Sequence, residues 1–220
     1  EHRFRKLSAA ELRWTALWSR ATLNDPNLRE TVYVADAARG LSFRESTQSG
    51  QHFYAAQGET TRSVGVDWTQ PVSKGDNPTK IKGGGLLTLR GRSFNARRFR
   101  FLRNSAADPA LFRQRGDALF TDENVGPALE IEEWTRPTDT YAAQYNVYAG
   151  YLMSDVGITS KLRFVAGERI EVSNQTIESY DPFAPTSSDR VESKLRNTDL
   201  LPSGNLIYKL TEASNIRLTA

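Results

Sequence analysis

Apolar and polar residues alternate with a period of two along most of the sequence. The segment 11–19 reads ELRWTALWS, so that leucine, alanine and two tryptophans occupy every second position. The same alternation returns in four further segments: 63–69, 141–153, 162–175 and 206–218. Alternation over this many residues is typical of β-strands that have one apolar and one polar face. We therefore predict an all-β protein with about eight antiparallel strands.

The connections between the predicted strands alternate in length. Short turns are predicted near 6–10, 73–79, 154–160 and 212–214, and long polar loops at 26–61, 103–139 and 180–198. Up-and-down hairpins then place the short turns at one end of the sheet and the long loops at the other. The strand at 81–103 greatly exceeds the average globular strand of about 5–6 residues, although three glycines, 83–85, permit a bend or bulge in it.

The two predicted faces differ in chemistry. The apolar face carries aromatic residues at similar distances from the short turns, as in the aromatic girdle of a membrane barrel: Trp14, Trp68, Tyr151, Phe164 and Tyr208. In the segment 141–153 we assign the residues Tyr141, Tyr145, Val147, Tyr151 and Met153 to this apolar face. The opposite face carries charges, as the polar interior of a wide barrel does: Arg13, Asp67, Arg90, Arg92, Arg163, Arg169, Glu171 and Arg217.

Glu168 does not fit this division, because it continues the spacing of the apolar residues Leu162 and Phe164. A carboxylate that faces lipid is unfavourable, most of all at the middle of the bilayer. Three explanations are open: a bulge shifts the register, Glu168 lies at a contact with protein, or it lies near the outer membrane interface.

Composition narrows the range of functions. No run of about 18 apolar residues exists, which excludes a membrane-spanning helix but not spanning strands. The chain has no cysteine and only two histidines, and its net charge is +3. Thiolate metal sites, cysteine nucleophiles and a Ser-His-Asp triad are therefore not expected. We predict that the chain is not an enzyme and has no catalytic residues, metal site or cofactor.

An arginine-rich run, FNARRFRFLR at 94–103, is the strongest candidate for binding. We interpret it as the outer extension of a barrel strand, where arginine binds lipopolysaccharide phosphates outside or an anionic substrate inside. A solvated strand with ordinary cross-strand pairs and a nucleic-acid stripe remain as alternatives. The extracellular loop candidates are Arg97, Arg98, Arg100 and Trp134. The substrate-facing candidates of the interior are Arg90, Arg92, Arg163 and Arg169, which could equally pair with carboxylates of a separate domain that fills the interior, or line water.

Several segments resemble the barrel of proteobacterial TonB-dependent receptors. The most specific are KLRFVAGERIEVSNQTI (161–177) and NTDLLPSGNLIYKLTEASNIRLTA (197–220), and weaker similarity covers LRETVYV (28–34), FNARRFRF (94–101), FTDENVGP (120–127) and RPTDTY (136–141). Two positions depart from the family pattern: Gly204 replaces a bulky apolar residue, and Glu168 replaces a small one.

The resemblance implies that residues 1–220 are part of a transmembrane barrel domain of about 22 strands, with short periplasmic turns and long extracellular loops. The plug domain and the other strands are absent from this sequence, and Ala220 falls within a strand pattern. The implied parent lies in the bacterial outer membrane, contacts lipid and lipopolysaccharide, and binds TonB through its plug. It takes up a siderophore, cobalamin or an oligosaccharide and binds no nucleic acid. The alternative is a soluble β-sandwich binding module.

Overall fold

The computed structural model describes residues 1–4, 9–37, 40–46, 49–74, 77–183 and 190–219. Parts of the turns predicted near 6–10 and 73–79, part of the loop predicted at 180–198, and Ala220 lie outside these residues. One sheet contains nine strands: β1 (His2–Phe4), β2 (Ala10–Glu30), β5 (Gln51–Pro71), β6 (Lys80–Arg103), β7 (Leu129–Glu133), β8 (Thr140–Gly157), β9 (Leu162–Ser179), β10 (Val191–Lys209) and β11 (Asn215–Thr219). A separate hairpin contains β3 (Tyr33–Asp36) and β4 (Gly40–Phe43).

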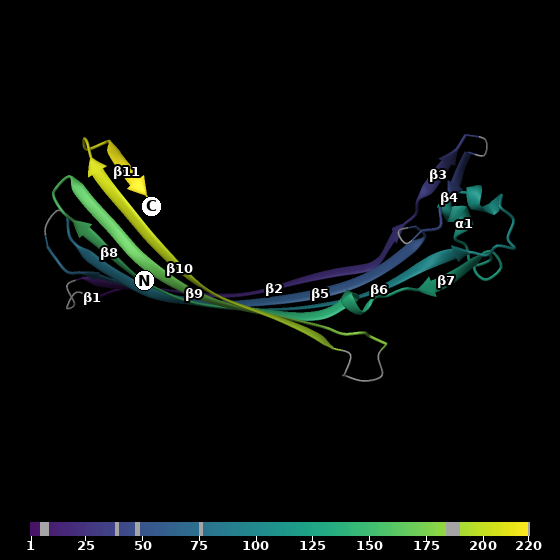
Figure 1. Cartoon of the computed structure of the whole chain (residues 1–220), viewed down its shortest axis with the longest axis horizontal. Helices are drawn as coiled ribbons and strands as arrows, with labels where there is room; N and C mark the ends of the chain where they lie inside the picture. The colour runs from purple at the N-terminus through teal and green to yellow at the C-terminus, as the bar shows by residue number, and fades with distance from the viewer. Residues whose placement is uncertain (5–8, 38–39, 47–48, 75–76, 184–189, 220) are drawn as a thin grey trace.

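The sheet is antiparallel and follows the order of the chain. Its strands lie in the order β1-β2-β5-β6-β8-β9-β10-β11, and β7 pairs with the last five residues of β6, at the end of the sheet that carries the long loops and that we call the outer end. The predicted all-β class and the antiparallel up-and-down topology are therefore confirmed, whereas the described residues form nine strands in this sheet and two in the hairpin where about eight were predicted. Figure 1 shows that the long strands together form a deep arc. The described strands do not close into a barrel, because β1 and β11 occupy the two edges of the sheet.

The turns and loops lie at opposite ends of the sheet, as predicted. Figure 1 shows β1 and β11 at the end with short connections, and β3, β4, α1 (Gly116–Leu119) and β7 at the other end. The predicted loops at 26–61 and 180–198 are too long, because β2 continues to Glu30, β5 begins at Gln51 and β10 begins at Val191. These strand ends do not alternate cleanly, because Phe53 and Tyr54 are adjacent on β5 and Leu195 of β10 lies on the face opposite to Leu200, so alternation in the sequence does not reveal them.

The register is continuous where a bulge was considered. Residues 83–85 pair without a shift with both β5 and β8, and Glu168 pairs without a shift with β8 and β10. The shift in the sheet lies instead between Asp25 and Leu28, on β2.

The predicted apolar face of the segment 141–153 is wrong. Tyr151 lies directly opposite Arg169, so the odd-numbered residues of β8 belong to the charged face. The even-numbered residues Tyr148, Leu152 and Val156 share the apolar face instead. Alternation was ambiguous here because both sets contain large apolar or aromatic side chains. Tyr151 therefore leaves the proposed aromatic girdle.

The largest buried apolar side chains gather where the long loops pack against the ends of β6 and β7. Phe43, Phe101, Phe112, Leu119 and Leu129 form one buried cluster, which we call the loop core. Its members come from β4, β6, β7, the short 3-10 helix η2 (Leu111–Arg113) and α1, so the two long loops pack on each other and on β6. A second 3-10 helix, η3 (Pro137–Asp139), precedes β8. The described residues contain no second sheet that could form a β-sandwich with the first.

Candidate functional site: the two faces of the curved sheet

The convex face of the sheet carries an apolar band whose side chains are exposed. Trp14, Trp18 and Leu152 are 56%, 65% and 64% exposed, which is unusual for side chains of this size. Register places the following members of the band on the same face: Leu12, Val64, Val66, Trp68, Ile81, Leu87, Leu89, Tyr148, Phe164, Ile170, Val172, Leu200, Leu206, Tyr208, Ile216 and Leu218. A contiguous exposed apolar surface of this extent marks an interface with lipid or with another macromolecule.

The band is slanted with respect to the strands. We define a cross-strand row as the residues that lie directly opposite one another on successive strands. The row of Leu12 reaches β10 at Pro202, but the band on β10 extends six residues further (202 to 208), to Tyr208. At about 3.3 Å per residue and about 4.8 Å per strand, this is about 20 Å along the strands over about 24 Å across them. The lower edge therefore has a slant of about 40°.

The upper edge of the band slants in the same direction. The row of Trp18 on β2 reaches β10 at Arg196, whereas the band on β10 ends at Leu200, four residues lower (196 to 200). The corresponding angle is about 30° with the same spacings. A horizontal apolar belt on strands that are tilted by about 35–45° has this form.

Glu168 lies on the convex face inside the band. It is exposed and stands directly opposite Leu152 on β8 and Pro202 on β10. The band on β9 extends from Leu162 to Val172, so Glu168 is near its middle and not at its upper edge. The continuous register excludes the bulge, and this position excludes the outer interface; of the three explanations, a contact with protein remains.

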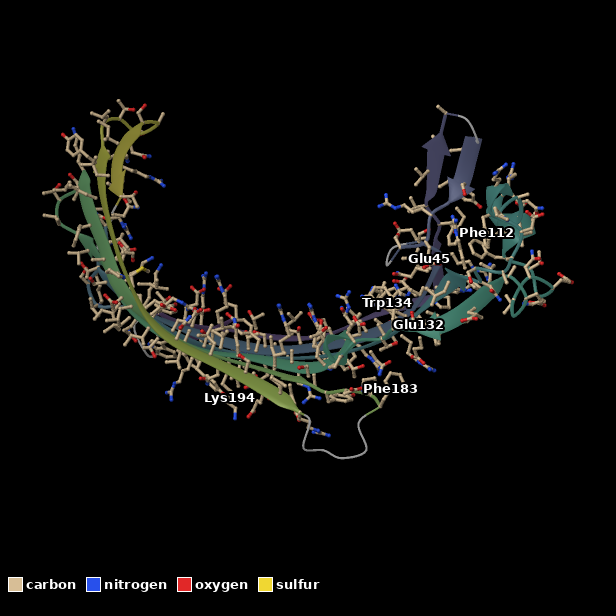
Figure 2. All side chains as sticks on the ribbon, turned by 45° about the vertical axis from the view of Figure 1, so that its right-hand side comes forward. Glu45, Phe112, Glu132, Trp134, Phe183 and Lys194 are labelled. Atoms are coloured by element: carbon tan, nitrogen blue, oxygen red, sulfur yellow. The ribbon has the colours of Figure 1, made fainter. Side chains whose placement is uncertain are left out.

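The concave face carries the charged residues predicted for the interior. Figure 2 shows side chains with terminal nitrogen atoms along this face, and it shows Lys194 on the opposite, convex side. Arg90, Arg92, Arg163 and Arg169 all lie on the concave face, as predicted. They are not free cations, however, because each one contacts a carboxylate on a nearby residue.

These ion pairs join neighbouring strands or neighbouring positions. Arg92 Nε donates to Glu59 Oε2 at 2.7 Å, and Arg90 Nε lies 3.6 Å from the other oxygen of Glu59. Arg163 donates to both oxygens of Asp155, at 2.6 and 2.8 Å. Arg169 Nη2 donates to Glu171 Oε2 at 2.8 Å. The sequence suggested pairing with carboxylates of another domain, but in the structure these arginines pair with carboxylates of the sheet itself.

A hollow of about 460 Å³ lies on the concave face above Arg90 and Arg92. Tyr141 and Tyr145 line it together with the two arginines. Aromatic rings beside a few polar groups are typical of small-molecule sites. The sequence suggested the arginines but assigned both tyrosines to the wrong face.

Tyr151 and Asp67 form a contact across the glycines of β6. The Tyr151 hydroxyl donates to Asp67 Oδ1 at 2.7 Å. Gly84 lies between the two residues in the same cross-strand row. A Cβ atom on Gly84 would lie 2.6 Å from Tyr151 Cε1 and 2.8 Å from Asp67 Oδ1. The second of the three glycines therefore provides the space for this hydrogen bond.

Trp134 lies among arginines on the concave side of the outer end (Figure 2). The guanidinium carbons of Arg98, Arg100 and Arg136 are 5.7, 5.9 and 4.8 Å from the centre of a ring of Trp134. Arg98 Nε donates to Asp139 at 2.9 Å. The indole Nε1 of Trp134 is buried and has no hydrogen-bond partner among the described residues. We call Trp134 and these three arginines the Trp134 cluster.

The Trp134 cluster combines three of the four predicted loop candidates with one residue that the sequence did not suggest. β7 pairs with the end of β6, and Trp134 N–H donates to the carbonyl of Arg98. This pairing brings Trp134 beside Arg98 and Arg100. Arg136 was missed because its position depends on η3, which begins one residue later.

Arg97, the fourth predicted loop candidate, lies on the convex face. Its Nε and Nη2 donate to the two oxygens of Glu133 at 2.9 and 2.7 Å. These hydrogen bonds lower the pKa of Glu133 and raise the pKa of Arg97. Successive residues of a strand point to opposite faces, so the arginines of 94–103 divide between two surfaces. They do not form the single stripe of the nucleic-acid alternative.

No protein-family model matches the chain, and no curated protein matches it. No helix among the described residues is long and apolar enough to cross a membrane. Within the described part of the chain, no group of three or more His, Asp and Glu side chains is arranged to hold a metal ion.

Proposed function

We propose that this chain is part of the wall of a bacterial outer-membrane β-barrel, of the kind found in TonB-dependent receptors. The convex face contacts lipid, and the concave face lines the interior. The parent protein takes up a scarce nutrient, such as a siderophore, cobalamin or an oligosaccharide, with energy supplied through TonB. The family assignment rests on the sequence resemblance of the segments 161–177 and 197–220.

The observation that carries the membrane assignment is the slanted apolar band on the convex face. On β6, β8, β9 and β10 the band covers 9 to 11 residues of each strand, as from Leu162 to Val172 on β9. A membrane-spanning strand needs about 9–11 residues. Beyond the band the long strands β2, β5 and β6 continue, which suits extension above the lipid.

Two places on the concave face are suited to contact the nutrient. The Trp134 cluster lies at the outer end, where a ligand from the medium arrives first. The hollow beside Arg90 and Arg92 lies further down the same face. Both combine guanidinium groups with aromatic rings, which favours ligands that carry anionic or planar groups.

Cysteine labelling tests the lipid and water faces directly, since these 220 residues contain no cysteine. Leu87 and Thr88 are adjacent on β6 and belong to the convex and concave faces. In outer-membrane vesicles that contain the intact protein, a hydrophilic maleimide should label Thr88→Cys but not Leu87→Cys. Detergent should make Leu87→Cys reactive.

Equal labelling of the two variants before detergent is added contradicts a lipid-facing band. A third variant, Ala106→Cys, lies at an exposed position of the outer loop and should react with the same reagent on intact cells. Its failure to react, while the protein is present in the outer-membrane fraction, contradicts the proposed orientation of the loops.

A further inference from the structure

The convex face contains a second cavity, which lies far above the apolar band. It has a volume of about 550 Å³ and is lined chiefly by His52 and Tyr54 of β5, by Arg97, Phe99 and Phe101 of β6, and by Ile131 of β7. We call it the outer cleft. Register places its main residues on the same face as the band: Tyr54 stands opposite Arg97, and His52 stands opposite Phe99.

The walls of the outer cleft are aromatic and fixed in position. The rings of Tyr54 and Phe99 meet edge to face with centroids 5.8 Å apart, and those of His52 and Phe101 do so at 5.4 Å. Phe101 is also part of the loop core, which anchors this wall. The Tyr54 and Ile131 side chains are 37% and 55% exposed, so apolar surface is left open to a ligand.

The polar groups of the cleft are charge-balanced. Arg97 lies 5.0 Å above the Phe99 ring, and it is held there by its two hydrogen bonds to Glu133. Burial, and then the nearby Arg29, lower the pKa of His52, so this imidazole is neutral at neutral pH. A sugar suits this cleft better than a phosphate group does. The aromatic rings can pack against the C–H faces of a sugar, and the neutral imidazole and the ion pair can form hydrogen bonds with its hydroxyl groups.

The surface between the band and the outer cleft has a different chemistry. Arg20, Arg62 and Arg196 lie on the convex face at the upper edge of the band. Among the described residues, none of these three arginines forms an ion pair. Unpaired guanidinium groups directly above an apolar band favour phosphate groups at that height. We call these three residues the arginine belt.

Distance separates the outer cleft from the lipid. Val64, in the band, and Tyr54 are ten residues apart on β5 (64 to 54), which is about 33 Å along a strand. A tilt of about 40° reduces this to about 25 Å of height. From below upward, the convex face therefore presents apolar residues, free cations and then an aromatic cleft.

We propose that the outer cleft binds the saccharide chain of an outer-leaflet glycolipid, a lipopolysaccharide, whose phosphates lie on the arginine belt and whose acyl chains lie on the apolar band. Such a glycolipid carries acyl chains, phosphates and sugars in this same order. The inference rests on the proposed outer-membrane function and adds a specific binding site for a membrane-anchored sugar on the outside of the wall.

The test measures the binding of two purified lipopolysaccharides to the intact protein in detergent. One carries the full core saccharide, and the other is a deep-rough form that lacks it. Tyr54→Ala should weaken binding of the full-core form by about 5- to 10-fold, as expected for the loss of one aromatic anchor. It should leave binding of the deep-rough form unchanged.

Two further variants keep the test decisive. Ile131→Glu, at an exposed position of β7, should reproduce the effect of Tyr54→Ala if folding disturbs the first variant. Arg62→Ala should weaken binding of both lipopolysaccharides equally, because both retain the phosphates. A cleft variant that weakens both forms equally overturns the saccharide assignment, as does one that weakens neither.

Other occupants give different results. If the saccharide released from lipopolysaccharide binds as tightly as the intact glycolipid, the site is for a free sugar and the proposal is wrong. If Tyr54→Ala binds both forms like the wild type but loses a co-purifying protein, the cleft is a protein interface. The cysteine labelling of Leu87 and Thr88 is independent, so it shows whether the membrane function or only this inference has failed.

Discussion

Replacing Gly84 by alanine should destabilise the sheet far more than the same change one residue earlier. The new Cβ would lie 2.5 Å from the carbonyl oxygen of Val66, as well as close to Tyr151 and Asp67. Optimal contacts between carbon atoms are about 3.5–4.0 Å. The carbonyl belongs to the neighbouring strand, so a side-chain rotation alone cannot relieve the overlap. A Cβ on Gly83 has its nearest neighbour at 3.5 Å and fits.

The magnitude follows from two effects. Overpacking of this kind lowers the free energy of unfolding by about 1–3 kcal/mol. Displacement of the Tyr151 ring also breaks its hydrogen bond to the Asp67 carboxylate, which contributes about 1.5–3 kcal/mol in a buried site and less here, because the two side chains are only partly buried. The sum for Gly84→Ala is about 2–4 kcal/mol. Gly83→Ala should be neutral or stabilising by up to about 1 kcal/mol, since glycine is unfavourable in a strand.

Urea unfolding of the intact protein in micelles, followed by tryptophan fluorescence, measures both variants. Tyr151→Phe separates the two effects, because it removes the hydrogen bond and adds no atom. Its loss should be smaller than that of Gly84→Ala. Equal free energies of unfolding for Gly83→Ala and Gly84→Ala would refute the reasoning, because the two changes differ only in the face on which the methyl group appears.

Three further predictions concern other parts of the chain. In a bilayer that contains no partner protein, Glu168→Leu should raise the free energy of unfolding by about 1–2 kcal/mol, because the uncovered charge then lies on a lipid-facing surface; Glu192→Leu, outside the band, is the control, and equal effects of the two changes contradict this placement. Phe112→Ala should expose the loop 104–128 to trypsin while the sheet stays folded, because Phe112 belongs to the loop core. Unfolding of the sheet in this variant would contradict the idea that the loop core and the sheet are stable independently. The folded pKa of His52 is lowered, so its contribution to stability is fully present above about pH 6.5 and declines as the pH falls below it; the protection factors of backbone amides at the outer end, which correct for the intrinsic pH dependence of hydrogen exchange, should be lower at pH 5.5 than at pH 7.5, and His52→Gln should remove the difference.

The sequence predicted the sheet well where only one set of alternate positions is apolar. In the segment 11–19, and again in 162–173 with the exception of Glu168, every second residue is apolar, and the structure places these residues on one face. Alternation does not identify the apolar face of β8, because tyrosines occupy both sets of alternate positions. Only the pairing of Tyr151 with Arg169 decides between the faces, and that pairing depends on the neighbouring strand.

The outer end was much harder to predict. Its core combines Phe43 from one loop with Phe112 and Leu119 from another, and these residues are distant in sequence. No local pattern indicates that two long polar loops share a hydrophobic cluster. The contacts of Arg103 could not be predicted for the same reason. Its guanidinium carbon lies 5.4 Å from the centre of the Phe43 ring and 4.7 Å from the centre of the Phe112 ring, and these contacts exist only after both loops have folded.

Ion pairing on the concave face limits where an anionic ligand can bind. A ligand at Arg163 or Arg169 would have to compete with a carboxylate that already accepts hydrogen bonds from the guanidinium. The Trp134 cluster differs, because three arginines share two carboxylates there: Arg98 pairs with Asp139, Arg100 pairs with Glu132, and Arg136 has no ion-pair partner among the described residues. This surplus of one positive charge lies beside an aromatic ring at the outer end. An anion that enters from this end therefore meets an available guanidinium there before it reaches the paired arginines further down the wall.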